Sequence, residues 1–102
     1  MYIRNILTKI KGLMHAGNDQ VYFEMIQKVL QGDDEELWKF LTSNDLWGGA
    51  GSIADQALID DKGLRKELER LLIDLAEQQT KEGRLNQRTK SWVDAFIAWS
   101  KK

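Results

Sequence analysis

The glycine-rich run at residues 48–52 is the part of the sequence that most resembles a ligand-binding loop. It consists of Gly48, Gly49, Ala50 and Gly51 followed by Ser52, and glycine-rich loops before helices can bind phosphate through backbone amides. A P-loop, however, requires a lysine after its last glycine, and the dinucleotide-binding fingerprint follows a strand. Because neither condition is met, we predict a tight turn with Ser52 as a helix N-cap. Ligand binding and contact with a partner are the alternative interpretations.

The side chains that usually carry metal or nucleophilic chemistry are scarce. The chain has no cysteine and a single histidine, His15, so a metal or nucleophilic site would need several carboxylates around one imidazole. His15 lies beside a predicted helix C-terminus, where an imidazolium interacts favourably with the helix dipole. We therefore predict no catalytic residue, no metal, no cofactor and no enzyme activity.

Acidic residues are concentrated in the middle of the chain. Residues 18–61 contain ten acidic residues and only two bases, Lys28 and Lys39, whereas both flanking segments are net positive. Seven of these acids are candidate partner-binding residues: Asp33, Asp34, Glu35, Glu36, Asp55, Asp60 and Asp61. The first four suit the first turn of a helix, since Asp33 and Glu36 have the spacing of a capping box. If folding brings all seven together, we expect one acidic face that binds and steers a basic protein.

Tryptophan is the other residue type that could mark a binding surface. Trp38, Trp92 and Trp99 lie on apolar helical stripes and are interpreted as core residues. Trp47, between Leu46 and the glycine run, has two interpretations. It fills one end of a helical bundle, or it lies at an interface, where tryptophan often contributes much of the binding energy.

Helices are the elements predicted to position these residues. There is no proline, and the apolar residues between most glycines recur at helical spacing rather than alternating as in a strand. The first helix ends near Gly17, a predicted left-handed C-cap, and Asn18 is the predicted N-cap of the second. The second helix, at about residues 19–31, is apolar over more than half of its circumference. We therefore predict that it lies at the centre of the bundle.

The second half of the chain is predicted to contain two short helices and two longer ones. A short third helix with Leu37, Trp38, Phe40 and Leu41 is separated from a short helix after Ser52 by an irregular segment at 43–52. The long helix after residues 60–63 carries a leucine stripe, with the pairs Arg65–Glu69 and Arg70–Asp74 on its solvent side. Ile73 points away from the leucines, which indicates a second contact with a partner or another copy. A last helix follows Gly83.

Length and composition predict one all-α domain at residues 1–102, a compact bundle of about five helices with the glycine-rich loop between the third helix and the next short helix. No apolar run reaches the ~20 residues of a membrane span. The N-terminus lacks the features of a signal peptide. A cytoplasmic protein without membrane contact is therefore expected.

The run from Leu46 to Leu58 resembles a motif found in small bacterial helical proteins of unknown function. That motif reads aromatic-Gly-Gly-Met-Gly-Ser-hydrophobic-Asn-Asp, followed by three hydrophobic residues. The matching positions are Gly48, Gly49, Gly51, Ser52 and Asp55, whereas Ala50, Ala54 and Gln56 depart from the motif. The resemblance covers about residues 3–78 and implies the helical fold, but it implies no activity. Some of those proteins resemble immunity proteins encoded beside bacterial toxins.

These features together predict a protein–protein interaction module, of an immunity or regulatory type, whose acidic face binds a basic partner. Two alternatives stay open. One is nucleic-acid binding through the basic C-terminal region, which contains Lys81, Arg84, Arg88, Lys90, Lys101 and Lys102. The other is a self-associating structural role with Ile73 at the contact.

Overall fold

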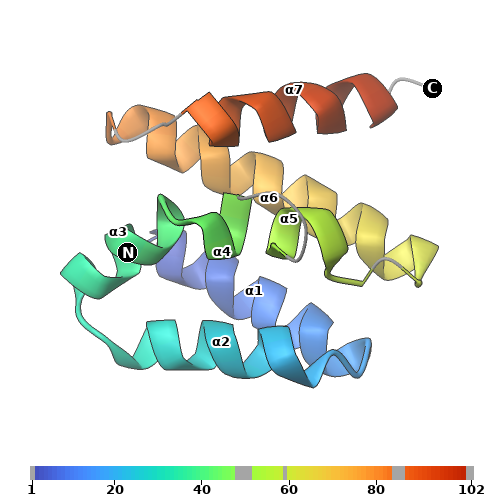
Figure 1. Ribbon diagram of the computed structural model, residues 1–102, viewed down its shortest axis with the longest axis horizontal. Coiled ribbons are helices and arrows are strands. Elements are labelled where there is room, and N and C mark those ends of the chain that lie inside the picture. Colours follow the sequence, from blue (N-terminus) through green and yellow to red (C-terminus); the bar gives the residue numbers. More distant parts are fainter. Residues whose placement is uncertain (1, 48–51, 59, 84–86, 101–102) are drawn as a thin grey trace.

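All the regular secondary structure in the described part of the chain is helical (Figure 1). The computed structural model describes residues 2–47, 52–58, 60–83 and 87–100. Within them, five helices have eight residues or more: α1 (Tyr2–Ala16), α2 (Gln20–Gln31), α3 (Asp34–Leu41), α6 (Lys62–Lys81) and α7 (Gln87–Ser100). Two more have four residues each, α4 (Asn44–Trp47) and α5 (Ile53–Gln56). The predicted all-α bundle of about five helices is confirmed, although α4 falls in a segment that was expected to be irregular.

The helices pack around α1 and α6. α1 packs against α2 on one side and α6 on the other, and α6 lies between α1 and α7 (Figure 1). The short helix α4 contacts α3, α5 and α7. The bundle measures 35 × 27 × 24 Å with a radius of gyration of 12.5 Å, close to the ~13 Å of a compact chain of this length. No helix in the described residues is long and apolar enough to cross a bilayer.

The prediction that the second helix is the centre of the bundle is wrong. α2 packs mainly against α1 and α3 and lies at the outer edge of the bundle (Figure 1, bottom). Of its seven apolar side chains only Ile26 is fully buried, and Val21 is 69% exposed. α1 has a narrower apolar stripe, yet five of its side chains are buried: Ile3, Ile6, Leu7, Ile10 and Met14. The width of an apolar face therefore does not decide which helix is covered from both sides.

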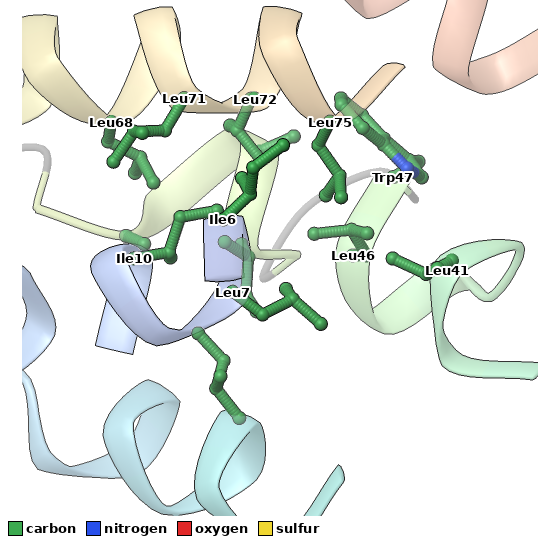
Figure 2. Packing of buried hydrophobic residues seen from close by; sticks show 14 of the residues in the cluster. Ile6, Leu7, Ile10, Leu41, Leu46, Trp47, Leu68, Leu71, Leu72 and Leu75 are labelled. Atoms are coloured by element: carbon green, nitrogen blue, oxygen red, sulfur yellow. The ribbon is translucent and has the colours of Figure 1, made fainter. Parts of the chain in front are cut away.

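The core is continuous from α1 through α6 to α4. Figure 2 shows the leucine stripe of α6 (Leu68, Leu71, Leu72 and Leu75) directed toward Ile6 and Ile10 of α1. Leu41 of α3 and Leu46 and Trp47 of α4 extend the same cluster. A fully buried leucine or isoleucine side chain contributes roughly 1.5–3 kcal/mol, so this cluster is the main source of stability.

α6 is covered on two sides, which explains the position of Ile73. This side chain is half-buried and packs against the core. α7 packs on the side of α6 that faces away from α1. An apolar residue on that second side of α6 therefore has a place within the bundle and does not require a partner. The expectation that Ile73 is an exposed contact for a partner or another copy is therefore wrong.

The turn between α1 and α2 uses Asn18 rather than Gly17 as its left-handed residue. Asn18 has φ +58°, its N–H bonds His15 O at 3.1 Å, and the N–H of Asp19 bonds Met14 O at 2.8 Å. This is the hydrogen-bond pattern of a Schellman motif, in which asparagine tolerates the left-handed conformation. Glycine at position 17 has a different effect, because a Cβ there would meet the side chain of Leu58, which would have to move.

Candidate functional site

The acidic first turn of α3 is an exposed and well-held group of carboxylates. Asp33 is the N-cap, and its Oδ1 accepts a hydrogen bond from the Glu36 backbone N–H at 2.9 Å, as the capping-box spacing predicts. The Glu36 carboxylate folds back over Gly32, where a Cβ would otherwise lie. The side chains of Asp33, Asp34, Glu35 and Glu36 are all exposed.

Arg4 of α1 holds this turn against the rest of the bundle. Its guanidinium donates to Leu30 O at 3.1 Å and Gly32 O at 3.2 Å, which are carbonyls at the end of α2, and to Asp34 Oδ1 at 2.9 Å. The Asp34 side chain keeps 72% of its surface exposed. One base therefore offsets one of the four carboxylates and fixes the direction in which α3 begins.

The structure does not bring the other acidic residues to this turn. α3 begins at one end of the longest axis of the molecule and α6 begins at the other (Figure 1). Asp60 and Asp61 are exposed next to the start of α6, where Asp61 Oδ1 accepts from the Leu64 N–H at 3.0 Å as the N-cap. Asp55 lies in α5, but its side chain is outside the description. The expected single acidic face therefore reduces to the run at the start of α3.

Trp47 is the predicted partner-binding residue that the structure removes from the surface. Its side chain is fully buried, so it fills the space between helices and has no exposed area for a partner. Its indole N–H donates to Gln79 Oε1 at 3.2 Å, and its carbonyl accepts from the Trp92 indole N–H at 3.0 Å. Gln79 in turn donates to Leu41 O at 3.1 Å. These hydrogen bonds link α3, α4, α6 and α7.

Gln79 was missed by the sequence reasoning although its position carried a signal. It lies eleven residues after Leu68, almost exactly three helical turns, and so falls on the leucine stripe of α6. A polar residue on such a stripe is buried and needs partners for its donor and acceptor groups. The periodicity predicts the burial, whereas the identity of the partners depends on where α3 and α4 are placed.

Arg65 is a second structural residue that the sequence placed differently. It pairs with Glu69 at 3.4 Å, as predicted, but the two side chains are only 14% and 22% exposed and do not lie on the solvent side. Its guanidinium also donates to Ala57 O at 2.9 Å and to Ala54 O, at the end of α5, and lies over the Phe96 ring at 5.8 Å. Arg65 thus joins α5, α6 and α7.

The solvent side of α6 carries a different ion network. Arg70 pairs with Glu67 and, at 4.0 Å, with Asp74, which confirms the predicted Arg70–Asp74 pair. The hydrogen bond from Arg70 holds the pKa of Glu67 below its ordinary value. Since all three side chains are well exposed, this network contributes little to stability.

The remaining candidate residues carry no assembled chemistry. His15 is exposed, 5.7 Å from the Phe23 ring, and Lys11 lies over the same ring at 5.9 Å. No group of three or more potential metal ligands occurs among the described residues.

The glycine-rich loop and part of the basic C-terminal region fall outside the description. Gly48, Gly49 and Gly51 are not described, and their neighbours Trp47 and Ser52 are both buried. Of the basic C-terminal residues, Lys81 and Lys90 are exposed. Arg84, Lys101 and Lys102, and the side chains of Arg88 and Trp99, lie outside the described part.

Searches against protein-family models, curated proteins and solved structures gave no match to this chain. The resemblance of residues 46–58 to the motif of small bacterial helical proteins therefore stays a prediction. The class that the structure defines is an all-α bundle, and the function has to be argued from its surface.

Proposed function

We propose that this protein is an interaction module that binds a basic protein partner through the acidic first turn of α3. The observation that supports the proposal is the set of four exposed carboxylates in one helical turn, at one end of the molecule. Only Asp34 among them forms an ion pair within the described residues. The other three carboxylates keep their charge available to a cationic partner.

The proposal is also supported by how firmly the turn is held. The Asp33 cap fixes the backbone of α3, and Arg4 bonds both that helix and the end of α2. A charged group that is already ordered loses less conformational entropy on binding than a mobile one. Clustered charge of one sign also accelerates the approach of an oppositely charged partner, in a salt-dependent manner.

The experiment is capture of proteins from a lysate of the native host on immobilised full-length chain, at low and moderate salt. The variant is Glu35→Lys, because Glu35 neither caps α3 nor pairs with Arg4. The matched control is Asp60→Lys, which makes the same charge change at the opposite end of the molecule. Far-UV circular dichroism and thermal unfolding establish that both variants are folded.

We expect a basic protein that is captured by the wild type and by Asp60→Lys, and whose capture is weakened by Glu35→Lys and by rising salt. Reversing a charge at the rim of an interface changes affinity by roughly 1 kcal/mol per pair, or about five-fold. Capture that is equal for Glu35→Lys and wild type would contradict the proposal. Recovery of nucleic acid instead would favour the alternative role of the basic C-terminal region.

A further inference from the structure

The end of α5 is held by side chains from two other elements. Leu58 follows this short helix in the left-handed conformation, with φ +58°, and its N–H donates to Asp19 Oδ2 at 3.2 Å. The guanidinium of Arg65, in α6, donates to Ala57 O at 2.9 Å and to Ala54 O. A left-handed residue at a helix end normally returns its N–H to a carbonyl of its own helix. The end of α5 therefore depends on partners outside that helix.

Leucine is an unfavourable residue for the left-handed conformation. Its Cβ lies too close to the following carbonyl oxygen, and only glycine, or at times asparagine or aspartate, adopts this region routinely. The conformation is maintained here because the Leu58 side chain is buried and occupies the space where a Cβ of Gly17 would lie. Backbone strain of this kind persists only where the surrounding structure imposes it, and it is often found in switch regions.

Asp19 is the N-cap residue of α2, yet its side chain does not cap that helix. It forms no cap hydrogen bond, and its backbone has φ −97° and ψ 76°, outside the extended region in which an N-cap residue usually lies. Aspartate is one of the best N-cap residues. The carboxylate that could stabilise the first turn of α2 is bonded to Leu58 instead. The same side chain therefore has two alternative uses, and each excludes the other.

We propose that Asp19 is a two-position switch that either holds the left-handed turn at Leu58 or caps α2, and that the exchange releases the end of α5 while the bundle stays folded. Release loses one hydrogen bond and the burial of the Leu58 side chain. It gains a helix cap and relieves the strained backbone. Because the gains offset part of the losses, this opening lies below global unfolding. The buried Ile53 and the bond from Arg65 to Ala54 O keep the rest of α5 in place.

The switch is separate from the proposed acidic site. Figure 1 shows the α1–α2 turn and the start of α6 at one end of the longest axis, and the start of α3 at the other. The proposal therefore does not depend on partner binding by α3.

The test is amide hydrogen exchange of the full chain, followed by NMR at Leu58 and in the first turn of α2. The variant is Gly17→Ala, whose added methyl displaces the Leu58 side chain, at a position without a left-handed φ. We expect exchange about five-fold faster at Leu58 and about five-fold slower in the first turn of α2, the equivalent of one helix cap. The matched control is Gly12→Ala in the same helix, where a Cβ meets nothing within 4 Å, and it should change neither rate.

Two substitutions of Asp19 separate a switch from a simple structural contact. Serine caps helices well but is too short to reach the Leu58 N–H, so Asp19→Ser should give the same opposite changes as Gly17→Ala. Asp19→Ala removes both uses and should accelerate exchange at Leu58 without slowing it in α2. Circular dichroism establishes that each variant is folded. The proposal is overturned if Asp19→Ser accelerates exchange at Leu58 with no slowing in α2, or if Leu58 stays as protected as in the wild type.

Discussion

At the scale of single residues, Gln79 shows what one polar side chain does in an apolar core. Its amide is fully buried, accepts from the Trp47 indole N–H and donates to Leu41 O. Buried polar groups are tolerated when they are paired, and a partner that is left unpaired costs about 1–3 kcal/mol. The arrangement therefore favours one placement of α4 on α6 over others that bury the same apolar area.

We expect Gln79→Met to destabilise the protein by about 2–3 kcal/mol. Methionine has a similar volume and continues the apolar stripe, but it leaves the Trp47 indole N–H and Leu41 O buried without their partner. The measurement is urea unfolding followed by circular dichroism at low protein concentration. Gln78→Met, one residue earlier and only partly buried, is the control and should change stability by less than about 0.5 kcal/mol. Equal effects at the two sites would contradict a role for the buried hydrogen bonds.

At the scale of elements, α7 is the long helix with the fewest connections to the rest of the bundle. Its substantial contacts within the described residues are with two helices, α6 and α4. Phe96 and Thr89 are its buried residues within the described part, and Trp92 bonds the carbonyl of Trp47. A helix that is held by few buried contacts is expected to open locally before the global unfolding transition.

We expect Trp92→Phe to accelerate amide hydrogen exchange in α7 by about five-fold and to leave exchange in α1 unchanged. Phenylalanine keeps most of the apolar contact but removes the donor to Trp47 O, a net loss of about 1 kcal/mol. Exchange measured by mass spectrometry on peptides from α1 and α7 makes the comparison within one sample. Trp38→Phe on α3 is the control and should leave α7 protected as in the wild type. Uniform acceleration in both helices would show that α7 opens only with the whole molecule.

At the scale of the whole molecule, the arrangement of layers decides how much each helix contributes to stability. α1 lies between α2 and α6, whereas α2 has one side free (Figure 1). Leu7 of α1 is fully buried and Leu30 of α2 is only partly buried. The same substitution at these two positions therefore compares the centre of the bundle with its edge.

We expect Leu7→Ala to cost about 3–4 kcal/mol and Leu30→Ala about 1–2 kcal/mol. Removing a fully buried leucine loses its transfer free energy and leaves a cavity, whereas removing a partly buried leucine loses less transfer free energy and leaves a smaller cavity. Chemical unfolding at low micromolar concentration measures both values without a contribution from self-association. Equal costs would mean that α2 is covered in solution as fully as α1.

Local patterns in the sequence were enough to determine the fold class and the ends of several helices. The helical spacing of the apolar residues predicts α1, α2, α3, α6 and α7, and the Asp33–Glu36 spacing predicts the cap that begins α3. These features depend on neighbours within one or two turns, so the chain carries them without reference to distant segments. The placement of Leu68 to Leu75 on one buried face of α6 follows in the same way.

The tertiary structure alone decided which helix is central, which aromatic residue is buried and which acids lie together. α2 is apolar over more than half of its circumference and yet lies at the edge. Trp47 is buried and hydrogen-bonded to α6 and α7. The start of α6, next to Asp60 and Asp61, lies far from the start of α3. The physical reason is that periodicity specifies the direction of a side chain relative to its own helix axis. What lies in that direction depends on the packing of segments that are distant in the sequence.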